Sequence, residues 1–203
     1  MMRATDLTLT VCDATGFAAW ETRFMALYLE AFTSGSYHGH YLDEAAERAW
    51  LRRLFAQHRA RCYLLHEGTT LAGFLLMADA AYDRKLPADM RQQLAGQQVW
   101  ALAELAVAPA YQRQGLAARL LAQCLADCIA LPRDDEAASC GTTLIVRTQA
   151  DALGAHRLYE RYGFAWWGEV QVPVAVLQPE GLRWRQVSKH YYRCAMVRLE
   201  CVV

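Results

Sequence analysis

The chain has 203 residues and no formal net charge, because 21 basic side chains balance 21 acidic ones. Apolar residues make up 55% of it, which excludes an intrinsically disordered protein, and the length suits one domain spanning residues 1–203. Neutrality argues against a nucleic-acid partner. No apolar run approaches the roughly 20 residues of a membrane span, so we expect no membrane partner either.

The N-terminal stretch and the cysteines indicate a cytoplasmic protein. The first residues, "MMRATDLTLTVCD", alternate in polarity and lack the apolar core of an export signal. The cysteines are odd in number and scattered, which favours reduced thiols. They lie at positions 12, 62, 124, 128, 140, 194 and 201. Cys124 and Cys128 share one face of a predicted helix, and we interpret them as core residues, so no metal site is expected.

Hydrophobic periodicity predicts the elements of the first half of the chain. Residues 6–12 alternate and predict a strand, and residues 16–32 place their aromatic side chains on one helical face. Asp43 has the side chain and position of a helix cap, so a second helix follows it. The run "CYLLHEGTTLAGFLLMA" predicts a hairpin that turns at Glu67-Gly68.

The second half continues the alternation of strands and helices. We expect a polar, partly helical segment at 79–96, a strand at 97–107 and a helix at 115–130. One face of that helix carries Leu116, Leu120, Leu121, Cys124, Leu125, Cys128 and Ile129. A buried strand at 142–148 and a helix at 151–162 that Gly163 ends should follow, then strands at about 164–177 and 187–200 around a turn at 179–181.

This order of elements defines the fold class. A strand-helix-strand-helix sequence in the middle of the chain demands parallel pairing with a crossover, whereas both ends favour antiparallel hairpins. We therefore predict an α/β domain with a mixed central sheet of about seven strands flanked by helices. The apolar C-terminal segment "CAMVRLECVV" could pair across a homodimer, so the oligomeric state stays open.

The junction at 107–121, "VAPAYQRQGLAARLL", has the features of an anion site. A helix N-terminus leaves its first N–H groups unpaired and carries about half a positive charge. Small residues at Gly115 and Ala117 let a diphosphate approach the backbone, and Arg113 and Arg119 add positive charge. The expected cradle is Gln112, Arg113, Gln114, Gly115, Leu116 and Ala117. An ordinary strand-to-helix turn is the alternative, because short glycine motifs often occur by chance.

The same stretch resembles the acyl-CoA-binding motif of the GCN5-related N-acetyltransferase (GNAT) superfamily. That motif runs strand, V-x-P, Q/R-x-x-G-x-G/A, helix, and it is met by Val107, Pro109, Gln112, Gly115 and Ala117. A second signature of the superfamily, A-x-x-L-Y-x-x-x-G-F, is met by Ala155, Leu158, Tyr159, Gly163 and Phe164. Together they cover about residues 97–168. Ala152 stands where many members carry an Asn that contacts pantetheine, so no such contact is expected.

The resemblance implies a GNAT-like fold and acetyl transfer from acetyl-CoA, as cosubstrate, to a primary amine. The pantetheine arm would then run along the strand backbone at Leu105, Ala106 and Val107, with an N–H near Leu105 as the donor to the oxyanion. Tyr159 holds the position of the superfamily's acid, which protonates the leaving thiolate. Its alternative role is core packing, since it lies on the apolar stripe of its helix.

The acceptor amine must be neutral to attack, and deprotonating a lysine-like ammonium costs about 4 kcal/mol at pH 7. A general base would lower this barrier. Glu104 is the only acid on the central strand and is our candidate; a structural salt bridge or a solvated position is the alternative. The rival residues, where the superfamily builds its acceptor pocket, are Tyr37, His38, His40 and Asp79.

The acceptor itself is left open. The aromatic loop at 33–41 and the segment 79–96 could wall a pocket, which favours a small-molecule amine. A protein N-terminus or lysine is the second candidate, and it predicts an open groove between that loop and the 171–187 hairpin. A non-catalytic acyl-CoA-binding protein is the third, expected if Glu104 points into packing.

Overall fold

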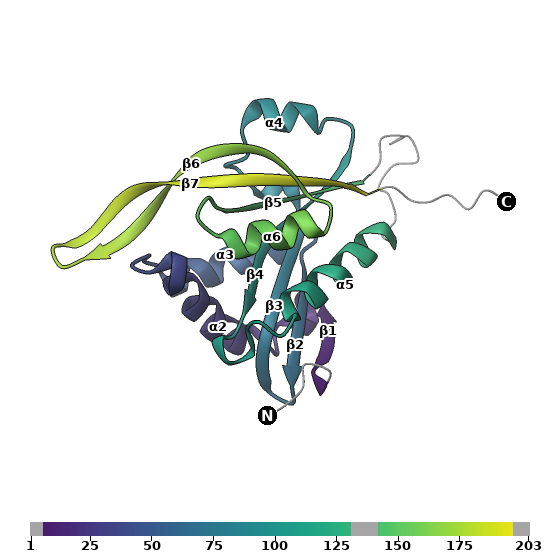
Figure 1. Ribbon diagram of the computed structural model, residues 1–203. Coiled ribbons are helices and arrows are strands. Elements are labelled where there is room, and N and C mark those ends of the chain that lie inside the picture. The colour runs from purple at the N-terminus through teal and green to yellow at the C-terminus, as the bar shows by residue number, and fades with distance from the viewer. Residues whose placement is uncertain (1–5, 131–141, 197–203) are drawn as a thin grey trace.

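The computed structural model describes residues 6–130 and 142–196 and contains a seven-stranded sheet flanked by helices (Figure 1). The strand order is β1-β2-β3-β4-β5-β7-β6, and every neighbouring pair is antiparallel except β4 and β5. The strands are β1 (Thr8–Cys12), β2 (Arg61–Glu67), β3 (Thr70–Asp79), β4 (Gln98–Val107), β5 (Thr142–Gln149), β6 (Ala165–Gln178) and β7 (Gly181–Met196). The predicted mixed α/β sheet is confirmed.

Helices connect these strands on both faces of the sheet. In the described ranges they are α1 (Ala14–Phe17), α2 (Glu21–Thr33), α3 (Glu44–Gln57), α4 (Ala88–Gln93), α5 (Leu116–Ala130) and α6 (Leu153–Arg161), with short 3-10 helices η2 (Gly35–Tyr37), η3 (Ala80–Tyr82) and η4 (Pro109–Tyr111). Within this part of the chain, no helix is both long and apolar enough to cross a membrane.

The sheet is covered by α5 and α6 on one face and by α2 and α3 on the other (Figure 1). Strand β3 shows how the sequence achieves this. Leu75 and Met77 belong to the core cluster of α5, whereas Phe74 and Leu76 belong to the cluster of α2. Because successive side chains on a strand point to opposite faces, a continuous apolar run lies between two layers of helices.

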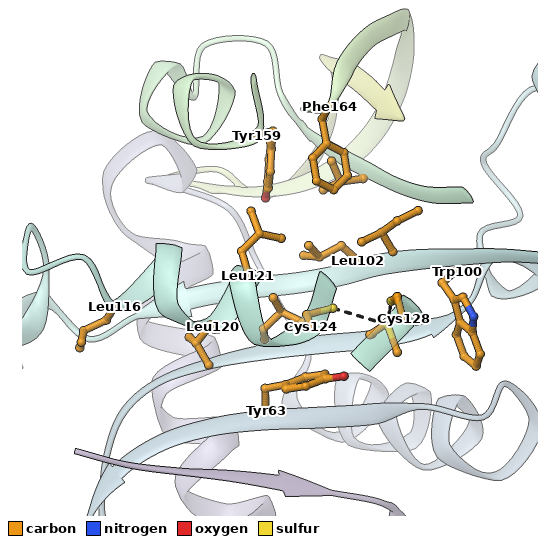
Figure 2. Close-up of a cluster of buried hydrophobic side chains, with 14 of the residues drawn as sticks. Tyr63, Trp100, Leu102, Leu116, Leu120, Leu121, Cys124, Cys128, Tyr159 and Phe164 are labelled. Atoms are coloured by element: carbon orange, nitrogen blue, oxygen red, sulfur yellow. Dashed lines mark hydrogen bonds between the residues drawn. The ribbon is translucent and has the colours of Figure 1, made fainter. Parts of the chain in front are cut away.

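Helix α5 packs against the sheet through one apolar stripe (Figure 2). The stripe consists of Leu116, Leu120, Leu121, Cys124 and Cys128, each at most 2% exposed. The sulfur atoms of Cys124 and Cys128 lie 3.5 and 3.1 Å from Sδ of Met77, so their predicted place in the core is confirmed. Ile129, which we expected on the same face, is 40% exposed. It follows Cys128 by one residue and is therefore rotated about 100° around the helix, away from the sheet.

The helix predicted at 16–32 is interrupted. It forms two helices, α1 and α2, because the Trp20 N–H bonds to the Phe17 carbonyl at 2.8 Å in a tight turn. Asp13 caps the first helix by accepting from the Gly16 N–H at 3.0 Å. The break lets the Phe17 ring stack on the Phe55 ring, with centroids 4.6 Å apart. The prediction of one continuous helix did not include this contact.

The second strand of the last hairpin begins at Gly181, six residues before the predicted start at 187. Its extra residues, 182–186, are exposed, so they carry no pattern of burial, and backbone pairing with β6 alone makes them a strand. The hairpin extends well beyond the rest of the sheet (Figure 1). Most of the segment proposed for dimer pairing, 197–203, lies outside the described residues.

Strands β4 and β5 separate at the centre of the sheet. Their parallel pairing ends with Leu102 opposite Val146, although β4 continues to Val107 along its other neighbour, β3. A bulge in β4 places one extra residue, Ala103, between the partners of Leu76 and Met77 on β3. The lower half of β4 therefore has a free edge towards β5.

Candidate active site

A cavity of about 520 Å³ opens where β4 and β5 separate. Its walls come from the end of α2, η2, the lower half of β4, the turn into α5, the end of β5, and α6. The predicted site residues that line it are Glu104, Leu105, Ala106, Val107, Gln112, Arg113, Gly115, Leu116, Ala117 and Tyr159. Gln114 does not line it, because its side-chain amide turns back and donates to the Ala110 carbonyl at 3.3 Å.

The turn into α5 presents a row of unpaired amides to this cavity. The first helical bond runs from the Arg119 N–H to the Gly115 carbonyl at 3.0 Å, and within the described residues the N–H groups of 113–118 bond to no carbonyl. Arg113 and Gly115 have φ of 61° and 81°, which curls the backbone into a concave nest. A Cβ built on Gly115 would meet nothing within 4 Å, so the space in front of the nest is open. These residues fit a diphosphate.

The free edge of β4 leads from this nest towards Glu104. The Ala108 N–H donates to the Ala72 carbonyl of β3 at 2.9 Å. Because alternate residues of an antiparallel strand face the same edge, Leu105 and Val107 direct their backbone groups to the open side. The Val107 carbonyl accepts from Gln112 Nε2 at 3.1 Å and retains a second lone pair. A peptide-like arm could pair here as an added strand.

Glu104 lies where this cavity meets a second one. The second cavity, of about 630 Å³, is lined by α2, α3, the segment after η3 and the centre of the sheet. Ala103, Glu104 and Arg147 line both cavities. A carboxyl group at this junction can face a thioester from one side and an amine from the other.

Burial raises the pKa of Glu104 to about 8. Glu47 raises it further, whereas Lys189 and Arg147 lower it. Among the described residues, no cation lies within ion-pair distance of this carboxyl, so the structural salt bridge that we considered is absent from this part of the chain. A partly buried carboxyl with a pKa near neutrality has the proton affinity of a general base.

Tyr159 packs in the core and also lines the first cavity. Its ring is 4% exposed and packs on Phe164 and Tyr192, with centroids 5.6 and 6.2 Å away, and Figure 2 shows it projecting from α6 towards α5. Burial, with smaller contributions from Tyr37 and Glu104, raises its pKa, so the hydroxyl keeps its proton. A protonated hydroxyl at this wall can donate to a leaving group.

The alternative candidates for the general base differ in their position relative to the first cavity. Tyr37 lines the first cavity, but His38 and His40 do not. Asp79 lies elsewhere, since it pairs with Arg59 at 2.8 Å and caps η3 through the Ala81 N–H at 2.8 Å.

Known proteins place the chain among acetyltransferases. The model described as acetyltransferase (GNAT) family matches residues 22–164. The chain belongs to this family. No curated protein sequence matches it.

Solved GNAT-type structures share the fold at low identity. The ribosomal-protein-S18-alanine N-acetyltransferase from Escherichia coli has a TM-score of 0.59 and 16% identity, covering 97% of this chain and 98% of that one. Arabidopsis thaliana NAA60, in complex with a bisubstrate analogue, has a TM-score of 0.60 and 12% identity, covering 93% and 98%. A GNAT family acetyltransferase from Elizabethkingia anophelis with acetyl-CoA bound has a TM-score of 0.55 and 15% identity, covering 94% and 98%.

Two charged residues of this GNAT site escaped the sequence analysis. Arg147 of β5 reaches the junction of the cavities and pairs with Asp83 at 2.9 Å. Lys189 of β7 is the cation that lowers the pKa of Glu104 most. A signal existed for the first, since Arg147 is the one charge in the buried run "TTLIVRT". None existed for Lys189, which lies 85 positions after Glu104.

The raised pKa of Glu104 predicts a pH-dependent stability. Folding raises this pKa above its ordinary value of 4.5, so the folded state holds the proton more tightly. Its contribution is complete below pH 4.5 and is lost as the pH rises through about 8. We therefore expect Glu104→Gln to gain stability relative to the parent as the pH rises from 4.5 to about 8, measured by urea unfolding.

The exposed residue Glu67, at the β2–β3 turn, provides the matched control. Glu67→Gln should leave the pH dependence of unfolding unchanged. Identical pH dependence in the parent and Glu104→Gln would show that Glu104 titrates in the folded protein as it does in the unfolded one.

Proposed function

We propose that the protein is an acetyl-CoA-dependent N-acetyltransferase whose acceptor is the primary amine of a small molecule. The observation that carries the proposal is the alignment of three features along one path: the amide nest before α5, the free edge of β4, and the Glu104 carboxyl shared by two cavities. Membership of the GNAT family and the neighbour with acetyl-CoA bound support the choice of cosubstrate.

Each group has a definite task in this reaction. The N–H groups of 113–117 would bind the diphosphate, and the backbone of Leu105 and Val107 would pair with the pantetheine amides. Glu104, when ionised, accepts a proton from the acceptor ammonium or from a water that relays it. The neutral nitrogen attacks the thioester carbon, an N–C bond forms, and the C–S bond breaks. The Tyr159 hydroxyl protonates the leaving thiolate, and the second proton that the nitrogen loses passes through solvent and restores the hydroxyl.

The loop at 39–41 supports a small acceptor over a protein. A peptide substrate needs an open groove between this loop and the last hairpin. In the structure, however, the Tyr41 N–H donates to the Ala175 carbonyl and the Leu177 N–H to the Gly39 carbonyl, both at 2.9 Å. These bonds bridge the groove.

The second cavity is the remaining approach to Glu104. Its lining includes the rings of Tyr28, Trp50 and Tyr82. A partly aromatic cavity of about 630 Å³ suits a small molecule. A protein acceptor stays the alternative, because the Escherichia coli neighbour is named for acetylating a ribosomal protein.

Titration with acetyl-CoA, followed by an assay of free thiol release, tests this function. We expect calorimetric binding and thiol release with at least one small amine, and weaker release with peptides. Gly115→Ala should weaken binding by about tenfold or more, roughly 1.4 kcal/mol, because a Cβ strains the backbone at φ 81° and deforms the nest.

Gly96→Ala is the control for backbone strain. Gly96 also has a positive φ, 76°, with nothing within 4 Å of its Cβ, but it lies outside the first cavity. It should bind acetyl-CoA like the parent. Binding without thiol release on any amine or peptide would support a non-catalytic acyl-CoA-binding protein instead, and absence of binding would refute the proposal.

The pH profile of turnover tests Glu104. Since the carboxyl must be ionised to accept a proton, kcat/KM should rise with pH and level off above about 8. Glu104→Gln should lower kcat by about 100-fold or more and remove this inflection. Two acceptors of different amine pKa separate the enzyme's ionisation from the substrate's, because an inflection that follows the amine would exclude Glu104 as its source.

Hydroxyl removal tests Tyr159. Tyr159→Phe should lower kcat with little change in the KM for acetyl-CoA, because the ring still packs while the proton donor is lost. Tyr162→Phe is the matched control on the same segment; it loses the bond from its hydroxyl to the Ala118 carbonyl, 3.1 Å, and should keep parental turnover. Unchanged turnover in a folded Tyr159→Phe would leave the residue only its packing role.

A further inference from the structure

Both lysines of the chain lie beside the candidate active site. Lysine occurs only at Lys85 and Lys189, whereas arginine supplies the other basic side chains. Lys85 is exposed and lines the second cavity. Lys189 lies on β7, opposite Gln149 of β5, and is half-buried. Lys85 therefore shares the second cavity with Glu104, and Lys189 lies close enough to Glu104 to lower its pKa.

Lys189 packs against a residue that lines the first cavity. Its Nζ lies 5.3 Å from the centroid of the Tyr37 ring, and Tyr37 lines that cavity with Glu104 and Tyr159. Within the described ranges, no carboxylate lies within ion-pair distance of this ammonium. Partial burial without an acidic partner is an unfavourable environment for a charged amine, which favours its neutral, nucleophilic form.

The charges around Lys189 agree with this. Burial lowers its pKa to about 8, and Arg147 and Lys85 act in the same direction, against Glu104 and Asp151. His40 also lies close enough to interact with it. Compared with an exposed lysine of pKa about 10.4, a pKa near 8 raises the neutral fraction at pH 7 by roughly 100-fold.

We propose that Lys189 is an internal acceptor and that the protein acetylates it with acetyl-CoA. The neutral Nζ attacks the thioester carbon, an N–C bond forms, and the C–S bond breaks. The nitrogen's proton passes to Glu104 or to solvent, and the CoA thiolate takes up a proton. The inference rests on the proposed function for its cosubstrate, but it needs no external amine.

Acetylation of Lys189 would change the site that performs it. The modified side chain is neutral, so Glu104 loses the cation that lowers its pKa most. Its pKa then rises further, and turnover on an external amine moves to higher pH. The modification therefore limits the enzyme's activity at neutral pH.

The test is incubation of the full chain with acetyl-CoA and no added amine, followed by mass spectrometry of the intact protein and its peptides. We expect one acetyl group, at Lys189, and at least tenfold slower modification of Lys85. The urea-unfolded chain reports the uncatalysed reaction of both lysines with acetyl-CoA. The rate at Lys189 should be independent of protein concentration, as an intramolecular step requires.

Variants separate this inference from the proposed function. Lys189→Arg keeps the charge and should lose the modification, whereas Lys85→Arg should retain it. Glu104→Gln and Gly115→Ala should slow it together with turnover on an external amine. An enzyme that releases thiol with added amines but leaves Lys189 unmodified, or acetylates Lys85 as fast as Lys189, would overturn this inference but not the proposed function. A protein that neither binds acetyl-CoA nor releases thiol would overturn both.

Discussion

The separation of β4 from β5 after Leu102 is the constraint on which the site depends. A central strand normally pairs on both edges, and buried backbone groups without partners are costly. Here the free edge at Leu105 and Val107 lies beside the unpaired amides that open α5. The helix begins only a few residues after the strand ends, so both sets of unpaired groups face one cavity and together suit a long ligand that is peptide-like at one end and anionic at the other.

The same separation determines the chemistry at Glu104. The bulge at Ala103 shifts the alternation of side chains, so that Leu102 and Leu105 both pack on the α5 side while Glu104 sits between the two cavities. Arg147 also reaches this point, but its charge is balanced by Asp83, whose second oxygen accepts from the Tyr191 hydroxyl at 2.7 Å. Burial therefore prevails over nearby cations in raising the pKa of Glu104.

Local signals predicted the parts of the fold that are local in the sequence. Periodicity predicted α5, and Gly163 ends α6 with φ 83° as expected. The position of the amide nest before α5 could also be predicted, because the helix, the turn and the glycine are contiguous in the sequence. Periodicity could not predict the exposed start of β7 at Gly181, because backbone pairing rather than burial creates it. The sequence also could not predict the charges around Glu104, because Arg147 and Lys189 come close to it only through the pairing of β4, β5 and β7.

The residues around the proposed acceptor path belong to segments that carry no family signature. The bonds between the 39–41 loop and β6 close one approach, and Tyr37, on which Lys189 packs, lines the first cavity. In the proposed reaction an external amine would come from the α3 side, through the cavity lined by Trp50 and Tyr82. In the proposed reaction the two signatures bind the acetyl donor, whereas the loop after α2, α3 and the segment following β3 would select the acceptor. Relatives that share only the signatures carry no information about that choice.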